Sequence, residues 1–363
     1  MGLIDYNSAL ESFFEKVPRI DLAYIKGLTS LTGIYQHAKF NIPDYHHGYC
    51  LDDNTRALLL FLMVSEEGNE PLDNNLVKTY LAYLYFSQKE NGWLRNFMSY
   101  DLRFLETTGS EDSMGRTIWT IGFLLAHKKF SKYHAIGKEI FDRIVNHVVT
   151  FKSIRAIAYS ILGILYFLEK YPNQKSQLHQ LNYLLGFVAR EYGSASSERW
   201  PWFEEILTYD NAIIPLSVLK AGRFLKNDKI IEIGVQSSIF LDSILFKECH
   251  LSLIGNNGWL TKSNQLNRGG QQPIEIASII LWYKELANLN IGIDCKEKIK
   301  LSFAWFIGVN DHKRCLFDFE NMACYDGLES YGMNKNMGAE SNIAFWMAYL
   351  HTREFYPINS KLF

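Results

Sequence analysis

Five short motifs that carry carboxylates recur along this chain, each just before an apolar stretch long enough for a buried helix. They occupy residues 47–54, 109–113, 207–211, 271–275 and 338–341. Acids that return at the same point of a helical repeat are expected to gather at one end of a ring. Paired carboxylates among hydroxyl-binding groups are typical of carbohydrate chemistry, in which one acid donates a proton and another accepts one.

Capping is the alternative explanation for each motif. Asp, Ser and Asn are favoured N-cap residues, and acids in the first turn complement the helix dipole. Asp52 and Asp53 exceed that need, because one cap uses one side chain and a second adjacent carboxylate adds repulsion unless something binds or titrates there. Glu111 and Asp112 form a second pair, and each pair is followed within four residues by an arginine. Such an arginine can hold one acid ionised and leave the other free to carry a proton.

Aromatic residues close to the acids are a second signal, in a chain with 15% aromatic residues. Aromatic faces can cover the C–H side of a pyranose while carboxylate and amide groups bind its hydroxyls, although packing in the core is the alternative for any one ring. A Gly-rich loop before the last motif also clusters polar groups and is expected to be exposed. The residues predicted to bind a sugar are Asp52, Arg56, His47, Trp200, Trp202, Glu204, Tyr209, Asp210, Asn211, Gln272, Glu275, Asp326 and Asn336.

The elements that position these residues are predicted to be helices. Apolar residues recur at helical spacing between Gly- and Asn-rich connections, and no convincing period-two strand is found. Apolar segments that we expect to be inner helices cover residues 56–64, 117–126, 156–168, 212–225, 274–286 and 342–351. Mixed segments that we expect to be outer helices cover residues 76–88, 134–150, 176–192, 228–245 and 296–307, with 6–16 and 22–31 available as the sixth partner.

Six inner and outer pairs predict an all-α fold, an (α/α)6 toroid in which the loops before the inner helices surround a funnel. We expect residues 1–363 to form a single domain, with residues 1–35 supplying an outer helix or helices. The gaps between equivalent points of the repeat are unequal, so a uniform solenoid is a weaker interpretation.

Composition excludes several classes of function. Lys+Arg 37 against Asp+Glu 39 gives a net charge of -2, which argues against nucleic acid and anionic lipid as partners. The five cysteines are odd in number and scattered, which argues against a disulfide framework and a zinc site and favours a cytoplasmic location. The first residues lack the pattern of a signal peptide, and no apolar run reaches the roughly 18 residues of a membrane span.

Other chemistry has little support in the sequence. His46 and His47 are possible metal ligands only in isolation, since no further ligands follow at a recognisable spacing, so no metal site is predicted. Phosphate-binding loops of the GxxxxGK[ST] and GxGxxG kinds are absent, and so is the Gly-x-Ser-x-Gly nucleophile motif. We therefore expect no cofactor.

The strings at residues 32–38, 49–58, 200–204, 207–211 and 338–341 resemble a bacterial family of the six-hairpin glycosidase superfamily. Members of that family occur alone or appended to glycosyltransferases, and the resemblance covers nearly the whole chain. It implies the (α/α)6 fold, the handling of sugars and a glycosyltransferase as a candidate partner. It transfers no established catalytic pair.

A shorter resemblance concerns bacterial endo-α-mannanases of the same superfamily, which use adjacent aspartates like Asp52 and Asp53. This chain has Leu51 and Thr55 where that family's string C-T-D-D-N-A-R has Thr and Ala. Both changes leave the two acids intact. The resemblance implies that a mannoside is among the candidate substrates.

These observations predict a glycoside hydrolase that acts on a short oligosaccharide. We expect inversion, with Asp112 or Glu111 as general acid and Asp53 or Glu340 as general base. Two alternatives remain. A sugar epimerase or isomerase acting on a monosaccharide would use histidine bases, and His37, His46 and His47 lie near Asp52 in the sequence. A non-catalytic sugar-binding module that accompanies a glycosyltransferase would use the same aromatic and acidic groups without cleavage.

Overall fold

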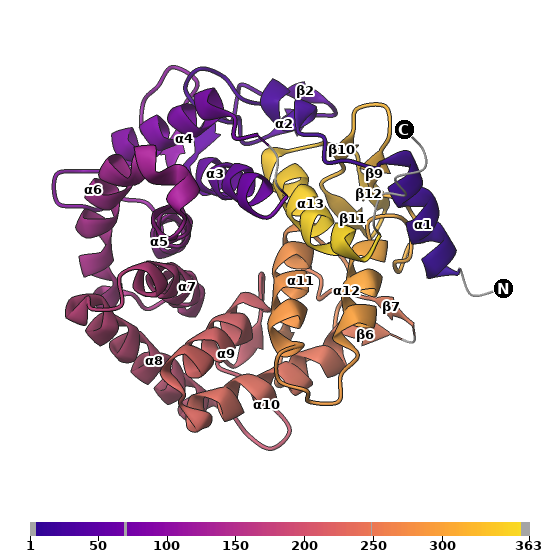
Figure 1. The fold of residues 1–363 in the computed structure, drawn as a ribbon. Coiled ribbons are helices and arrows are strands. Elements are labelled where there is room, and N and C mark those ends of the chain that lie inside the picture. The colour runs from indigo at the N-terminus through magenta and orange to yellow at the C-terminus, as the bar shows by residue number, and fades with distance from the viewer. Residues whose placement is uncertain (1–4, 69–70, 248, 357–363) are drawn as a thin grey trace.

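Six inner helices surround a common axis in the computed structural model, which describes residues 5–68, 71–247 and 249–356. Figure 1 shows them as an inner ring, and contacts between the last and the first of them close it. The inner helices are α3 (Leu51–Glu66), α5 (Glu111–Ala126), α7 (Ile154–Lys170), α9 (Ile213–Leu225), α11 (Ile274–Leu286) and α13 (Ala339–Thr352). Every apolar segment predicted to be an inner helix overlaps one of these six.

A second set of helices forms the outer ring (Figure 1). They are α1 (Tyr6–Lys16), α4 (Asn74–Ser87), α6 (His134–Ile144), α8 (Lys175–Ala195), α10 (Asp228–Leu245) and α12 (Cys295–Ala304). Shorter helical pieces are α2 (Ala23–Gly27) and the 3-10 turns Lys128–Tyr133, Val145–Thr150 and Arg353–Phe355. The alternation of inner and outer helices confirms the predicted all-α (α/α)6 toroid.

The two rings differ in their pattern of burial. The inner helix α5 is buried on every side from Asp112 to Leu125. The outer helix α4 buries Val77, Leu81 and Leu84 at the spacing of one helical face, so its other face meets solvent. No helix in the described ranges is long and apolar enough to cross a membrane.

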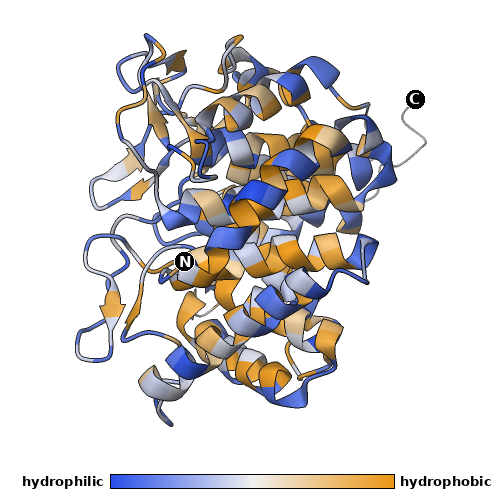
Figure 2. Cartoon of the chain, turned by 90° about the vertical axis from the view of Figure 1, so that its left-hand side faces the viewer, coloured by the Kyte–Doolittle hydropathy of each residue, from blue (hydrophilic) through white to orange (hydrophobic). Residues whose placement is uncertain are grey.

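Short strands and loops gather at one end of the ring, as the side view in Figure 2 shows. Each strand has only two or three residues, which is too short to produce a visible alternation in the sequence. The antiparallel pairs are β1 (Ala38–Lys39) with β2 (Ile42–Pro43), β3 (Tyr49–Cys50) with β4 (Phe97–Met98), β5 (Ile206–Leu207) with β8 (Leu260–Thr261), β6 (Phe246–Lys247) with β7 (His250–Leu251), β9 (Phe317–Asp318) with β10 (Ala323–Cys324), and β11 (Gly327–Glu329) with β12 (Gly332–Asn334).

Helices α5 and α7 approach each other at backbone distance. A Cβ added to Gly122 would lie 2.2 Å from the carbonyl oxygen of Gly163, and one added to Gly163 would lie 2.2 Å from that of Ile118. Glycine is therefore required on both sides of this contact. The close approach brings the first turns of the two helices together, where several of the predicted site residues lie.

Candidate active site

Acidic side chains from five of the inner-helix N-termini meet at one end of the ring, as the motifs predicted. The sixth helix, α7, contributes its N-cap Ser153, which hydrogen-bonds to one of these acids. The acids are Asp52 and Asp53 on α3, Asp112 on α5, Asp210 just before α9, Glu275 on α11 and Glu340 on α13.

Two adjoining cavities form a funnel at this end. Lobe A has a cavity volume of about 620 Å³ and lobe B one of about 640 Å³. Lobe A is lined by Gln36, His37, Ala38, Lys39, Asp44, His47, Cys50, Asp52, Asp53, Arg56, Phe97, Gln272, Asp326, Glu329, Asn334, Asn336, Gly338, Glu340 and Ser341. Lobe B is lined by Asp52, Arg56, Asn96, Phe97, Ser110, Glu111, Asp112, Arg116, Ser153, Tyr209, Gln272, Ile274 and Glu340. The residues common to both lobes, which we call the junction, are Asp52, Arg56, Phe97, Gln272 and Glu340.

Arg56 links two acids at the junction. Its Nη1 lies 3.0 Å from Asp53 Oδ1 and 2.9 Å from Glu340 Oε2. Asp53 is buried, and this burial raises its pKa to about 7, against the opposing effect of the Arg56 charge. The neighbouring carboxylates of Glu340 and Asp52 raise this pKa further. Asp53 can therefore carry a proton near neutral pH.

Arg116 makes the corresponding link on the side of lobe B. Its Nη1 lies 2.9 Å from Asp52 Oδ1 and 3.9 Å from Asp112 Oδ2, and its Nη2 donates to the hydroxyl of Tyr159 at 2.8 Å. The second oxygen of Asp52 accepts a hydrogen bond from Asn96 Nδ2 at 3.2 Å. These contacts hold the Asp52 carboxylate in one orientation.

The second acidic pair divides between two tasks. Asp112 accepts hydrogen bonds from the hydroxyls of Ser153 and Tyr209, both at 2.6 Å. Glu111 Oε2 accepts the backbone N–H groups of Lys152 and Ser153, both at 2.7 Å, just before α7 begins. Glu111 therefore helps to fix the start of α7. Of the two acids, Asp112 is the one that binds side-chain hydroxyls.

Asp210 adopts a left-handed backbone conformation, with φ of 46°. Its N–H donates to Glu275 Oε1 at 2.6 Å, and its Oδ2 accepts a hydrogen bond from the hydroxyl of Tyr159. Burial raises the pKa of Glu275 to about 8, and the nearby Asp210 charge adds to the shift. Glu275 is thus a buried support for the loop before α9.

Other predicted residues divide between the funnel and the core. His47, Asp326 and Asn336 line lobe A, and Gln272 lies at the junction. Asp326 Oδ1 accepts the N–H of Gly338 at 2.7 Å, which positions the loop that carries Glu340.

Trp200 and Trp202, by contrast, are buried in the core. The Trp200 ring lies 5.1 Å from Phe240 of α10, and its Nε1 donates to the carbonyl of Glu204 at 2.8 Å. Trp202 is fully buried. The structure therefore does not bring these rings to the funnel as sugar-stacking surfaces, because packing against neighbouring aromatic rings removes them from solvent.

The polar residues that follow these tryptophans in the sequence bind an arginine. Glu204 and Asn211 accept hydrogen bonds from Arg155, at 2.8 and 3.0 Å. Asn211 also accepts the N–H of Thr208 at 3.1 Å. These two predicted sugar-binding residues are occupied in fixing the loop before α9.

Several residues of the site were missed by the sequence analysis. Tyr159 lies inside an apolar helix, and Asn96 and Phe97 lie at the start of β4 without an acidic motif, so they show no pattern in a single sequence. Arg116 was noted as the arginine that follows Glu111 and Asp112, but it was not among the residues predicted to bind a sugar.

Two histidines lie side by side in lobe A. The rings of His37 and His47 have centroids 4.6 Å apart. Burial lowers the pKa of His37, and the neighbouring His47 lowers it further. His46 points elsewhere, since its side chain is exposed and its Nδ1 lies 2.7 Å from Asp44. Within the described residues, no group of three or more His, Cys, Asp or Glu side chains could hold a metal ion.

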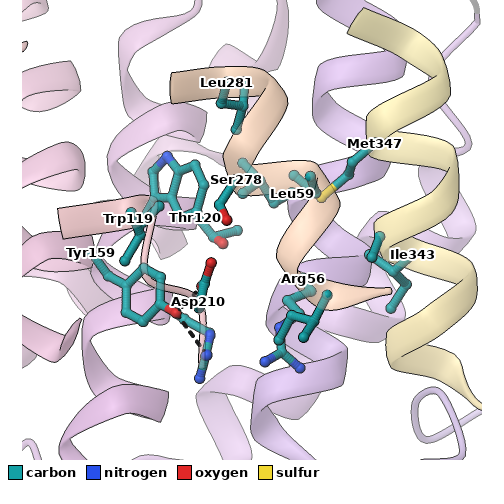
Figure 3. A pocket seen from close by; sticks show the side chains of 15 residues that line it. Arg56, Leu59, Trp119, Thr120, Tyr159, Asp210, Ser278, Leu281, Ile343 and Met347 are labelled. Atoms are coloured by element: carbon teal, nitrogen blue, oxygen red, sulfur yellow. Dashed lines mark hydrogen bonds between the residues drawn. The ribbon is translucent and has the colours of Figure 1, made fainter. Parts of the chain in front are cut away.

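A further pocket with a cavity volume of about 50 Å³ lies beneath the funnel, with walls from all six inner helices. We call it the axial pocket. Figure 3 shows Arg56, Tyr159 and Asp210 at one end of it and the apolar side chains of Leu281 and Met347 at the other.

Comparisons with known proteins identify the fold. No protein-family model matches the sequence, and no curated protein matches it. Among solved structures, a cellobiose 2-epimerase from Bacillus thermoamylovorans superposes with a TM-score of 0.73 at 8% identity, covering 96% of this chain and 100% of that one. A D-mannose isomerase gives a TM-score of 0.68 at 12% identity, covering 98% and 100%.

An α-1,6-mannanase from Salegentibacter is also similar, with a TM-score of 0.60 at 11% identity and coverage of 96% and 99%. That structure is an inactive variant in which two adjacent aspartates are replaced by asparagine, in complex with α-1,6-mannotriose. At these identities the three comparisons establish a shared fold.

Proposed function

We propose that this chain is a carbohydrate-active enzyme, and that it is a glycoside hydrolase which cleaves a short oligosaccharide at the junction of the two lobes. The observation that carries the proposal is the pair formed by Asp53 and Glu340 on Arg56. Arg56 and Glu340 lie where the lobes meet, and Asp53 lines lobe A beside them. Room on both sides of the pair would let sugar units extend into each lobe while the bond between them faces the acids.

The properties of the pair suggest a role for each acid. Asp53 has a pKa raised to about 7 and so can donate a proton to the glycosidic oxygen. Glu340 is more exposed and lies at the junction, where its carboxylate can approach the anomeric carbon. This choice differs from the sequence expectation, which made Asp53 or Glu340 the base and Asp112 or Glu111 the acid.

The spacing of the pair favours retention over the inversion expected from the sequence. Both oxygens contact the same nitrogen, at 3.0 and 2.9 Å, so they lie at most about 6 Å apart. This limit lies below the ~6.5–9.5 Å of inverting enzymes and includes the ~5–5.5 Å of retaining ones. In the first step, the carboxylate of Glu340 attacks the anomeric carbon as the bond to the leaving oxygen breaks and Asp53 protonates that oxygen. Water then attacks the glycosyl ester, and its proton returns to Asp53.

Other groups around the junction suit the binding of hydroxyls. Asp52 is oriented by Arg116 and Asn96, and Asp112 lies in lobe B. Asp52 and Asp53 are the one adjacent pair of aspartates in this sequence. The similar mannanase is inactive when two adjacent aspartates are replaced by asparagine, which supports testing Asp52 together with Asp53. It also makes α-1,6-linked mannosides the first substrates to try.

The test is a turnover assay with α-1,6-mannotriose and matched gluco-oligosaccharides, with chromatography of the products. Asp53→Asn and Glu340→Gln are expected to lower kcat by at least about 100-fold, while Asp52→Asn raises KM. Glu329→Gln, in lobe A away from the junction, is the matched control and is expected to remain active. Unchanged turnover in Asp53→Asn would remove the proposed acid. Binding of sugar with no product from any substrate would instead identify a sugar-binding module.

A sugar isomerase or epimerase is the second candidate, because His37 and His47 lie together in lobe A. The lowered pKa of His37 keeps its ring neutral at pH 7, as a base that abstracts a proton next to a carbonyl requires. Incubation with D-mannose or D-glucose and analysis by NMR distinguishes the two functions. New monosaccharide signals that disappear in His37→Asn and His47→Asn, without cleavage of any disaccharide, would favour this candidate over the hydrolase.

A further inference from the structure

The axial pocket communicates with the funnel through a shared set of residues. Arg56, Arg116 and Ile274 line both the axial pocket and lobe B. The two guanidinium groups therefore form the boundary between the pocket and the junction, and a group that hangs from a ligand at the junction would enter the pocket beside them.

Among the described residues, two buried polar atoms of this pocket's lining have no hydrogen-bond partner, the acceptor Asp210 Oδ1 and the donor Trp119 Nε1. Asp210 is only 5% exposed, and its Oδ1 lacks a hydrogen bond to any described residue, while its Oδ2 is taken by Tyr159. Figure 3 shows its carboxylate directed into the pocket, toward the hydroxyls of Thr120 and Ser278. Those hydroxyls donate their own hydrogens to backbone carbonyls of Thr55 and Glu275, so toward the pocket they act as acceptors. This corner therefore calls for a hydrogen-bond donor.

Asp210 is held so that this oxygen stays in place. Its backbone is in the left-handed region, its N–H is bound by Glu275, and its other carboxylate oxygen is bound by Tyr159. A strained backbone that is fixed from two further sides is typical of a residue placed for function. The unpaired oxygen is thus an oriented acceptor.

The charges of the pocket limit which donor can enter. A carboxylate or phosphate would meet the charge of Asp210, and a cation would meet the guanidinium groups of Arg56 and Arg116. A purely apolar group would leave Asp210 Oδ1 buried without a partner, which is unfavourable. The remaining wall is apolar, with Leu59, Leu281 and Met347. An uncharged hydroxyl on a short carbon chain can donate to Asp210 Oδ1 while its carbon atoms contact the apolar wall.

We propose that the axial pocket receives the hydroxymethyl group of a hexose seated at the junction, whose hydroxyl donates its hydrogen to Asp210 Oδ1. This inference rests on the proposed function, because it takes a sugar to occupy the junction. It adds the substrate class, since a pentopyranose has no hydroxymethyl group to fill the pocket.

Matched sugars test the proposal. D-mannose and D-lyxose differ only in the hydroxymethyl group, and so do D-glucose and D-xylose. Isothermal titration is expected to give an affinity at least about tenfold higher for one hexose than for its pentose, because a site built for a hydroxyl discriminates against the analogue that lacks it. In crystals soaked with that hexose, we expect its hydroxymethyl oxygen within hydrogen-bond distance of Asp210 Oδ1.

Variants of the pocket walls provide the second measurement. Ala277→Met fills the pocket from α11 and is expected to reduce the affinity for the hexose to that for the pentose. Leu286→Met lies on the same helix but outside the pocket and conserves volume, so it is the matched control and is expected to keep the preference. Ala344→Leu on α13 fills the same pocket and replaces Ala277→Met if that variant does not fold.

The outcomes separate this inference from the proposed function. Equal affinity for hexose and pentose, or a sugar in the lobes with only water against Asp210, overturns the hydroxymethyl subsite and leaves the hydrolase untouched. A hydroxymethyl group in the axial pocket, with no cleavage of any oligosaccharide, supports the subsite and overturns the hydrolase. Failure of all four sugars to bind the folded protein overturns the subsite, while the turnover assay decides the function independently.

Discussion

Asp53 combines two features that shift its pKa in opposite directions, burial of the carboxyl group and a nearby arginine. Burial raises its pKa to about 7, and Arg56 opposes this shift without abolishing it because Glu340 and Asp52 share the same surroundings. The result is a carboxyl group that can be protonated at neutral pH beside a guanidinium that stays charged. This division between adjacent groups is the arrangement that acid–base catalysis requires.

The raised pKa predicts the alkaline side of the pH–rate profile. If Asp53 must be protonated to act, kcat/KM of the proposed hydrolase is expected to fall as the pH rises through about 7, approaching tenfold per pH unit above it. Assays with the confirmed substrate between pH 5 and 9 would measure this limb. Glu329→Gln should show the same limb, and a profile that stays flat to pH 9 would contradict the role of Asp53.

The same pKa predicts an effect on stability. Because the pKa in the folded state lies above that of unfolded aspartate, the contribution of Asp53 to stability is fully present below about pH 4 and is lost as the pH rises through about 7. The wild type is therefore expected to lose about 2 kcal/mol of unfolding free energy between pH 5 and pH 7 through Asp53. Asparagine does not titrate, so Asp53→Asn should not show this loss, and its stability relative to wild type should rise by about 2 kcal/mol over the same range.

Urea unfolding at the two pH values measures this difference. Asp101→Asn is the control, since the pKa of that exposed aspartate is lowered, so it is ionised in both states across this range and should show no such gain. A constant difference between Asp53→Asn and wild type at both pH values would show that Asp53 does not titrate as proposed.

At the scale of single residues, the sequence predicted which acids meet but not what each one contacts. The motifs contain Asp52, Asp53, Asp112 and Glu340, and these four acids line the two lobes of the funnel. The links among them run through Arg56 to Glu340, 284 positions away, and such a pairing leaves no trace in a single sequence. Whether an acid is buried enough to hold a proton depends on these distant partners.

At the scale of elements, the contact between α5 and α7 is what assembles lobe B. Gly122 and Gly163 allow the two backbones to touch, which brings Arg116 within hydrogen-bond distance of Tyr159 and Ser153 within reach of Asp112. A wider separation would break both hydrogen bonds, so the packing of this helix pair and the geometry of the site are coupled.

Replacement of Gly163 by alanine tests this coupling. The added Cβ would lie 2.2 Å from the Ile118 carbonyl oxygen, which belongs to backbone that can move only with its helix. Gly163→Ala is expected to destabilise the protein by about 1–3 kcal/mol, as overpacking does, and to reduce turnover. Thermal and urea unfolding would measure the effect.

Gly193→Ala is the matched control, because a Cβ at that position of α8 meets no atom within 4 Å. It is expected to be neutral or to stabilise by up to about 1 kcal/mol, since alanine restricts the unfolded chain. Equal stability of the Gly163→Ala and Gly193→Ala variants would show that the backbone contact does not need glycine.

The sequence predicted the helices well because their burial is uniform along each segment. An inner helix such as α5, buried on all sides, appears as an apolar run that composition alone reveals. The rim strands are too short to alternate visibly. Trp200 and Trp202 were assigned to the site because aromatic residues near acids fit a sugar equally well as a core, and only packing against Phe240 decides between the two.

At the scale of the whole molecule, negative charge is concentrated in the funnel, although the net charge of the chain is small. The chain has a net charge of -2, yet eight carboxylates line the two lobes, against the three permanent cations Lys39, Arg56 and Arg116. The charges outside the lobes largely cancel, since 34 Lys and Arg residues remain against 31 Asp and Glu residues. An open funnel between low-dielectric walls focuses the field of such a group of charges on whatever enters it.

This field predicts discrimination against anionic sugars. Glucose 6-phosphate or glucuronate is expected to bind at least about tenfold more weakly than glucose, because each brings a negative charge into lobes where carboxylates outnumber cations. Raising the salt from about 0.05 to 0.5 M should reduce this difference in affinity by screening. Competition with the neutral substrate, or direct titration, would measure the affinities. Glu329→Gln removes one charge from lobe A and should reduce the difference in affinity between glucose and its anionic derivatives. Glu232→Gln on the outer helix α10 removes the same charge from the exposed surface and should leave this difference unchanged. Equal affinities for glucose and its anionic derivatives at low salt would mean that the carboxylates of the lobes are neutralised. The protonation states proposed for Asp53 and Glu340 would then be wrong as well.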